Sequence, residues 1–263
     1  MTIPHNILLE VIETSLYLLP ELPGRVEWLH IPGLRGRITA VSDFFANLVG
    51  AATLDSENAD QTIQQVFNLF TTQNKEFGWI IGPRSTPTDL TARLLRLGME
   101  LDVEMAGMAL TNLSVPIPVN PAVHIREATH ADLEPASRLL APALGIGFDG
   151  AHVVTESLLL SPSSLHRRVY LAFLSKSDEP VAYASTIYLP DQPVAVLFCA
   201  ATAETYRGRG IYTSLVARRL ADARRDGVQA AVIQAVRQTS APICSKLGFI
   251  ELSSLEWYNW FPP

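Results

Sequence analysis

The segment YRGRGIYTSL at residues 206–215 constrains the fold more than any other, because it joins two elements of different kinds. The run before it, PVAVLFCAAT at 193–202, is short and almost entirely apolar, which predicts a buried strand. The apolar residues of 211–226 recur at helical spacing on one stripe, which predicts an amphipathic helix that ends before Gly227. Charged residues take the other faces of this helix: Arg218, Arg219, Asp222, Arg224, Arg225 and Asp226. The glycines therefore lie in a turn from a strand into a helix.

Such a turn predicts a binding site for an anion. The first amides of a helix have no partner within the helix and lie at the positive end of its dipole. Gly208 and Gly210 allow the backbone to approach a bulky anion without Cβ clashes, and Arg207 and Arg209 add positive charge. A phosphate or pyrophosphate fits this arrangement. The alternative is an ordinary surface turn whose glycines only satisfy the backbone geometry.

Two familiar phosphate motifs are excluded. A dinucleotide-binding GxGxxG motif requires glycine where the chain has Thr213, and the sequence has no match to GxxxxGK[ST]. The net charge of −6 also argues against a general nucleic-acid-binding protein. The turn matches neither phosphate motif, so its interpretation rests on its own glycines and arginines.

Composition indicates a soluble, cytoplasmic protein with no membrane partner. Apolar residues make up 48% of the chain and charged residues 17%, which excludes the disordered class. Cys199 and Cys244 both lie among apolar residues, so we expect buried thiols in a reducing compartment. The N-terminus lacks the basic region of a signal peptide, and no uncharged apolar run approaches the roughly 20 residues that cross a bilayer.

The 263 residues are enough for two domains, and a proline-rich stretch separates them. We expect an N-terminal domain at 1–113, a linker at 114–121 and a C-terminal domain at 122–263. In the first we expect helices at 57–70 and 87–98, and strands at 77–81 and 99–110. In the second we expect strands at 122–128, 169–175, 180–189, 193–202, 228–236, 249–252 and 255–261, helices at 130–144, 156–162, 211–226 and 239–249, and a glycine-broken loop at 145–153. This order predicts a mixed α/β sheet.

One series of motifs and elements resembles the GNAT superfamily of acyl-CoA-dependent N-acyltransferases: RGRGIY at 207–212, the helix, the apolar strand and KLGF at 246–249. The family's pyrophosphate loop, Q/R-x-x-G-x-G/A, maps onto 207–211, with Tyr212 in place of the final small residue. The resemblance covers 122–263 in the family's element order. Residues 1–113 resemble the later part of a second, degenerate copy without a glycine-rich loop, as in two-domain members. The resemblance thus implies a GNAT-like C-terminal domain, and a partial GNAT-like N-terminal domain that binds no cofactor.

The resemblance also implies the cosubstrate, acetyl-CoA. The backbones of Ala200, Ala201 and Thr202 would pair with its pantetheine arm, and one of their N–H groups would polarise the thioester carbonyl. The pyrophosphate would be held by the loop: Arg207, Gly208, Arg209, Gly210, Ile211, Tyr212 and Thr213. No metal is expected, because the histidines lack the spacing of a metal site: His124, His130 and His166.

The implied reaction is direct attack of an amine on the thioester, which needs a base and an acid. The family's acid is a tyrosine in the pattern YxxxGF, and this chain has Cys244 at that position. Cys244 is a proton donor, a buried structural thiol or a covalent nucleophile, and the last has little support because no histidine lies near it in the sequence. Water, Tyr206 and Tyr212 are the alternative acids. Glu204 is the candidate base, or else a solvated residue at the helix entry.

An amine acceptor is the implied partner, with no nucleic acid and no membrane. The candidate acceptor-binding residues form an acidic lip for a cationic amine, or are ordinary surface residues: Asp149, His152 and Glu156. The favoured function is an N-acetyltransferase acting on a small molecule or a protein. The missing tyrosine supports a second hypothesis, a non-catalytic acyl-CoA-binding sensor or scaffold. A tandem acyltransferase with an aminoacyl or peptidyl acceptor is disfavoured, because the chain has no evident large basic face for tRNA.

Overall fold

The computed structural model of the chain describes residues 3–174 and 178–263. We call residues 3–113 the N half and residues 122–263 the C half. The N half contains α1 (His5–Thr14), η1 (Ser15–Tyr17), β1 (Val26–Trp28), β2 (Arg35–Thr39), β3 (Leu48–Gly50), α2 (Ala59–Thr71), β4 (Phe77–Ile81), α3 (Leu90–Arg96) and β5 (Glu100–Leu110). The sequence analysis predicted the last four of these and missed the earlier ones.

The C half follows the predicted order closely. It contains β6 (Val123–Glu127), η2 (His130–Asp132), α4 (Leu133–Leu144), α5 (Phe148–Leu160), β7 (Arg167–Leu174), β8 (Ala182–Tyr188), β9 (Val194–Val196), β10 (Ala200–Thr202), η3 (Glu204–Tyr206), α6 (Ile211–Arg225), β11 (Ala230–Val236), α7 (Ser240–Lys246) and β12 (Ile250–Trp260). None of the helices in the described residues combines the length and apolar character that a membrane span requires.

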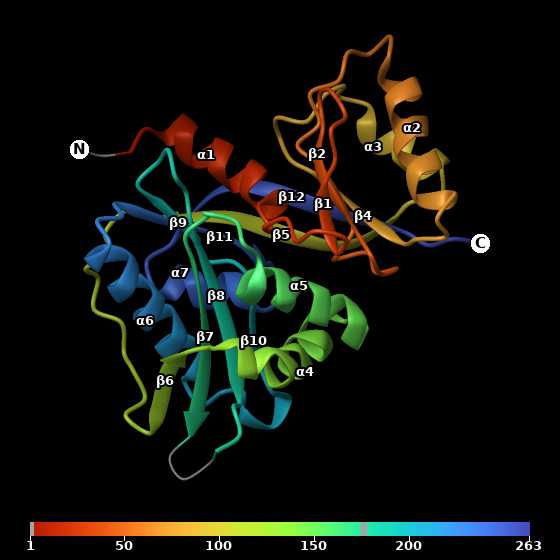
Figure 1. Cartoon of the computed structure of the whole chain (residues 1–263). Helices are drawn as coiled ribbons and strands as arrows, with labels where there is room; N and C mark the ends of the chain where they lie inside the picture. Colours follow the sequence, from red (N-terminus) through yellow and green to blue (C-terminus); the bar gives the residue numbers. More distant parts are fainter. Residues whose placement is uncertain (1–2, 175–177) are drawn as a thin grey trace.

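The described strands form one mixed sheet of 12 strands that runs through both halves. Its order is β1-β2-β3-β4-β12-β5-β11-β9-β8-β7-β6, and β10 pairs with β8. The last strand of each half lies beside strands of the other half, so that β12 pairs with both β4 and β5, and β5 pairs with both β12 and β11. Figure 1 shows β5 and β12 running side by side between the two halves. The fold is therefore α/β, with an exchange of strands at its centre.

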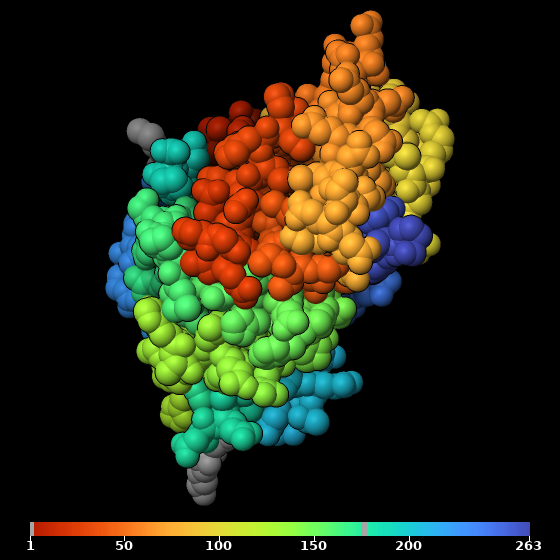
Figure 2. All heavy atoms as spheres, turned by 45° about the vertical axis from the view of Figure 1, so that its right-hand side comes forward, coloured from red at the N-terminus to blue at the C-terminus, as the bar shows by residue number. Residues whose placement is uncertain are grey.

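Helices cover both faces of the C half of the sheet. α4 and α5 pack on one face together with α1 of the N half, and α6 and α7 pack on the other. Figure 2 shows the residues of the N half, in red and orange, packed directly against the green residues of α4 and α5. The side-chain hydroxyls of Ser157 in α5 and of Ser161, which caps this helix, donate to the backbone carbonyls of Pro20 and Glu21 in the N half. The N half thus covers the outer side of α5.

The predicted glycine-broken loop at 145–153 is wrong, because residues 148–160 form the single helix α5. Gly150 serves close packing rather than a turn: a Cβ there would collide with the carboxylate of Asp43. The Oδ1 atom of Asp43 accepts the N–H groups of Phe45 and Ala46, both at 3.0 Å, which fixes this loop of the N half against α5. The glycine is therefore explained by a contact distant in sequence.

Two further expectations differ from the structure. The strands predicted at 249–252 and 255–261 are one strand, β12, with a register shift between Glu251 and Ser253. On α6, Arg219 and Asp222 were expected on exposed faces and are buried. Because Arg219 follows Leu215 by four residues, it lies on the apolar stripe of the helix rather than opposite to it.

The exchange of strands predicts that the two halves cannot fold separately. Residues 122–263 expressed alone should lack a cooperative thermal transition by circular dichroism, because β12 would lose both neighbours and β11 would lose β5. Co-expression of 1–113 with 114–263 should instead give a soluble complex with native circular dichroism. A cooperative transition of 122–263 alone would contradict this dependence.

Candidate functional site

The strand before the glycine-rich turn diverges from its neighbour. β9 pairs in parallel with β11 only from Val194 to Val196, and the last hydrogen bond joins the N–H of Leu197 to the carbonyl of Val232 at 2.8 Å. The chain then turns, with the N–H of Phe198 bonded to the carbonyl of Val196 at 2.9 Å. Among the described residues β10 pairs only with β8, so its other edge faces a gap toward β11. The predicted single strand at 193–202 is thus two strands interrupted at 197–199.

The residues at this gap remain partly accessible. Cys199, Ala200 and Thr202 are half-buried, whereas Ala201 is buried on the face covered by α4. Burial raises the pKa of the Cys199 thiol to about 12. Cys199 is therefore a neutral thiol at physiological pH, and the edge of β10 offers unpaired backbone groups next to it.

The glycine-rich turn follows β10 and leads into α6. We call residues 207–213 the seat, because their backbone is where an anion would bind. Gly208 has a φ of +75° and Gly210 a φ of +71°, a left-handed conformation that favours glycine. α6 begins at Ile211 and has no side-chain cap, and the first amide bonded back into the turn is that of Ser214, which donates to the carbonyl of Gly210 at 3.0 Å. The amides of residues 211–213 are consequently free for a ligand. Residues 207–210 are exposed, so the turn itself lies at the surface.

A residue of the predicted linker holds the turn in place. The N–H of Asn120 donates to Oγ of Ser214 at 3.0 Å, and its Nδ2 donates to the carbonyl of Arg209 at 2.9 Å. The sequence analysis missed Asn120, because nothing in its own neighbourhood points to the loop almost 90 residues later. The turn is therefore shaped by a contact from outside the loop.

The two arginines of the turn bind nearby carbonyls and remain exposed. Nε of Arg207 donates to the carbonyl of Thr202 at 3.3 Å, and Nη2 of Arg209 donates to the carbonyl of Thr205 at 3.1 Å. Arg209 also lies 5.3 Å from the ring centroid of Tyr206. Both cations thus lie at the rim of the seat, available to an anion.

The structure brings together two candidate residues, Tyr212 of α6 and Cys244 of α7. The hydroxyl of Tyr212 lies 3.5 Å from Sγ of Cys244. Cys244 is fully buried, and burial raises the pKa of both its thiol and the Tyr212 hydroxyl. Both groups therefore carry their protons at neutral pH, and the buried thiol is a poor nucleophile.

The other catalytic and acceptor candidates lie apart from this pair. Glu204 is exposed on η3, and its carboxylate has no hydrogen bond or ion pair among the described residues. Asp149, His152 and Glu156 share one face of α5, where Oε2 of Glu156 accepts Nε of Arg25 at 2.9 Å and lies 3.9 Å from Nδ1 of His152. Glu156 is thus engaged with the N half, while Asp149 remains exposed.

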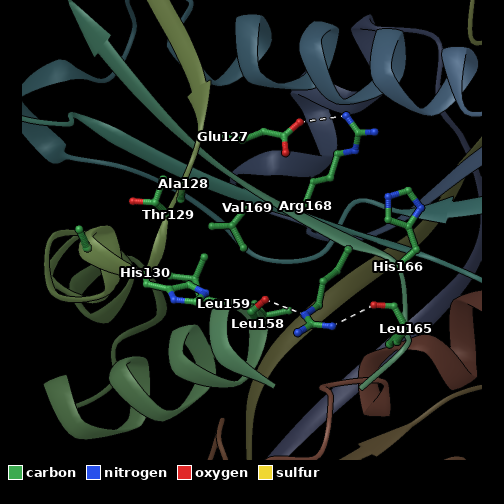
Figure 3. Close-up of a pocket in the computed structure, with 12 residues that line it drawn as sticks. Glu127, Ala128, Thr129, His130, Leu158, Leu159, Leu165, His166, Arg168 and Val169 are labelled. Carbon is green, nitrogen blue, oxygen red and sulfur yellow. Dashed lines mark hydrogen bonds and ion pairs between the residues drawn. The ribbon is translucent and has the colours of Figure 1, made fainter. Parts of the chain in front are cut away.

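A separate cavity of about 740 Å³ opens beside the start of β7. Figure 3 shows Glu127, His130 and Arg168 around it, with an ion pair of 2.9 Å between Glu127 and Arg168. It lies toward the end of β8, whereas the gap lies at the start of that strand, and it contains none of the predicted site residues. No cluster of three or more metal-ligating side chains occurs in residues 3–174 and 178–263.

Comparison with known proteins agrees with this architecture. Residues 148–249 match the model of the Acetyltransferase (GNAT) family. No curated protein matches the sequence. Among solved structures, a GCN5-related N-acetyltransferase from Kribbella flavida has a TM-score of 0.68 at 15% identity, with 100% of this chain and 97% of that chain covered.

Two further structures share the fold. A tandem GNAT protein from the clavulanic acid biosynthesis pathway has a TM-score of 0.62 at 11% identity, with 95% of this chain and 87% of that chain covered. A GCN5-related N-acetyltransferase from Sphaerobacter thermophilus has a TM-score of 0.60 at 14% identity, with coverages of 88% and 78%. The match assigns residues 148–249 of the C half to the GNAT acetyltransferase family, and the diverging strands and the glycine-rich seat lie within this segment.

Proposed function

We propose that the protein is an N-acetyltransferase that transfers the acetyl group of acetyl-CoA to an amine of a small molecule or a protein. The observation that carries this proposal is the uncapped start of α6 beside the gap between β10 and β11. The free amides of residues 211–213, with Arg207 and Arg209 at the rim, suit the diphosphate of coenzyme A. The edge of β10 that β8 leaves unpaired, from Ala200 to Thr202, suits its pantetheine arm, and the carbonyl of Thr202 on it also accepts Nε of Arg207 at 3.3 Å.

In the proposed reaction the amine nitrogen attacks the thioester carbon, the C–S bond breaks, and the leaving sulfur takes up a proton. Tyr212 is the best candidate for that proton donor. Tyr212 lies on α6, and its hydroxyl is 3.5 Å from Sγ of Cys244 on α7. Cys244 occupies the position at which the family's tyrosine is expected. Because burial raises the pKa of Tyr212, its hydroxyl holds its proton until the thiolate forms.

The base and the acceptor site are proposed with the remaining candidates. Glu204 takes the proton of the ammonium through water, which suits its exposed carboxylate on η3. Asp149 and His152 offer polar contacts to a cationic amine, because Glu156 is engaged with Arg25. The protein then needs no metal and no nucleic acid as a partner.

A non-catalytic acyl-CoA sensor is the second candidate. It is favoured by Cys244 at the expected tyrosine position. Release of free coenzyme A in the presence of a panel of amines separates the two functions. Binding of acetyl-CoA without turnover of any amine would favour the sensor.

The seat predicts a selective effect of Gly210→Ala on cofactor binding. Gly210 and Gly145 both have left-handed φ angles, of +71° and +66°, and a Cβ at either meets no atom closer than 3.8 Å. Either alanine variant should therefore lose about 1–2 kcal/mol of stability. Only Gly210→Ala should weaken acetyl-CoA binding, by roughly tenfold, because it disturbs the amides at the start of α6. Calorimetric titration and thermal unfolding of both variants measure these effects, and equal affinities would contradict the proposed seat.

The assignment of the acid predicts that Tyr212→Phe lowers kcat by about 10²–10⁴-fold and leaves acetyl-CoA affinity nearly unchanged. Cys244→Ala should retain most of the activity, since the thiol only contacts the hydroxyl. The raised pKa of Tyr212 also means that the wild-type enzyme keeps its proton donor well into the alkaline range. Steady-state kinetics against pH test this, and the reverse ranking of the two variants would assign the acid to Cys244.

A further inference from the structure

Arg219 of α6 is fully buried. Within the described residues no carboxylate oxygen lies within 4.0 Å of its guanidinium, although 13 ion pairs of that length occur elsewhere. Nε donates weakly to the carbonyl of Leu215 at 3.4 Å, Nη1 donates to the carbonyl of Ser185 at 3.3 Å, and Nη2 has no hydrogen-bond partner. A buried charge left in this state is costly, so its presence requires an explanation.

The other fully buried arginine shows how such a group is normally satisfied. Arg37 donates from Nε, Nη1 and Nη2 to the carbonyls of Ala46, Leu16 and Phe45, at 2.9, 2.7 and 2.7 Å. Three good hydrogen bonds hold that guanidinium in a structural role. Arg219 has only two long ones, so it is not explained as a structural arginine in the same way.

The nearest buried carboxylate on α6 is already occupied. Asp222 accepts Nε of Arg218 at 2.8 Å, Nη2 of Arg225 at 2.5 Å and the hydroxyl of Tyr170 at 2.9 Å, and it lies 3.7 Å from Nη1 of Arg168. These cations surround its oxygens. Arg219 lies on the same helix, but among the described residues it forms no ion pair with Asp222.

The guanidinium of Arg219 lies beside the interruption at 197–199. We call this the closed end of the gap, because β9 and β11 still pair up to Val196. Its acceptor Ser185 donates its own N–H to the carbonyl of Cys199 at 2.9 Å, in the interruption where β10 begins to leave β11. Burial raises the pKa of the Cys199 thiol, and Arg37 and then Arg219 lower it, so both buried guanidinium groups lie near this thiol. Burial raises the pKa of the Tyr212 hydroxyl and Arg219 opposes this, so these two groups are also neighbours. Arg219 is therefore next to both the edge of β10 and the proposed acid.

We propose that Arg219 binds a carboxylate at the closed end of this gap, carried by the acyl group of the donor. The proposal rests on the proposed function, which places coenzyme A along β10 and the thioester near Tyr212. The preferred donor is then a short dicarboxylic acyl-CoA, such as malonyl- or succinyl-CoA, and acetyl-CoA is the minimal donor. The amine nitrogen bonds to the thioester carbon, the C–S bond breaks, and the sulfur takes the proton of Tyr212. The nitrogen loses a proton to water, from which Tyr212 regains one, and the distal carboxylate stays unchanged on the product.

The position of Arg219 favours the donor as the source of this carboxylate. Arg219 belongs to α6, on the face of the sheet opposite to α5, which carries the candidate acceptor residues. An amine acceptor with its own carboxylate offers the same chemistry from the other face. The experiment therefore includes both sources.

Calorimetric titration with CoA, acetyl-CoA, malonyl-CoA and succinyl-CoA tests the donor without knowledge of the acceptor. The wild-type protein should bind one of the carboxylated thioesters about ten- to a hundredfold more tightly than acetyl-CoA, as expected for a charge-assisted hydrogen bond. Arg219→Met should remove this preference and keep acetyl-CoA binding. Arg224→Met, which removes an exposed positive charge from the same helix, is the matched control and should keep the preference.

A second measurement guards against a variant that fails for structural reasons. Removal of an unpaired buried charge should raise the Tm of the ligand-free Arg219→Met protein, whereas a structural arginine would lower it. Arg219→Lys should retain part of the preference. The wild-type protein alone also tests whether a carboxylated donor is preferred, because its affinities for the four ligands can be ranked without any variant.

The outcomes separate the two proposals. If none of the CoA compounds binds, the proposed function fails. If they bind with equal affinity in the wild type and in Arg219→Met, the proposed function stands and the carboxylate site is overturned. Turnover that depends on a carboxylate in the amine, with 4-aminobutyrate used and butylamine not used by the wild type but both used by Arg219→Met, would assign the carboxylate to the acceptor and overturn the donor assignment.

Discussion

β5 and β12 exchange places between the two halves, so that each half of the sheet is completed by a strand from the other. The candidate site depends on this pairing. One wall of the gap is β11, and β11 is held along its outer edge by β5 of the N half. Gln234 of β11 also donates from Nε2 to the carbonyl of Ile12 and to Oγ of Ser15, at 2.6 and 2.8 Å. The glycine-rich turn comes from the C half, but β11, one wall of the gap, is held by the N half.

The N half contains a parallel strand pair of its own, and its end is filled by side chains. β3 and β4 are parallel up to Gly50, where a Cβ would collide with the hydroxyl of Tyr17. Just beyond β4, a Cβ at Gly82 would lie 2.7 Å from Oε2 of Glu13, and that oxygen accepts the N–H of Arg84 at 3.2 Å. Burial raises the pKa of Glu13. The same arrangement of strands thus serves as a packed core in one half and as an open gap in the other, and the difference comes from α1 and η1.

Local chemistry explains which parts of this structure could be predicted from the sequence. The turn at 206–215 was interpretable because its glycines, its arginines and the helix that follows act on the same few backbone groups. The strand exchange was not, because pairing between β5 and β12 is decided by contacts about 150 residues apart, for which periodicity carries no signal. Gly150 was misinterpreted for the same reason. Arg219 did leave a signal, since it follows Ile211 and Leu215 on one helix face, but its charge favoured an exposed position.

α6 connects the separate parts of the candidate site into one rigid unit. Its first turn provides the free amides and Tyr212, and Arg219 follows Ile211 by eight residues, about 12 Å along the axis. Both ends of the helix are held from outside: Asn120 binds Ser214 near the start, and Tyr170 and Arg168 bind Asp222 near the end. A ligand that places its phosphates at the start of α6 therefore meets Tyr212 and Arg219 at a fixed spacing. Because the helix cannot adjust this spacing, the length of the acyl group, as well as its charge, decides which donor reaches Arg219.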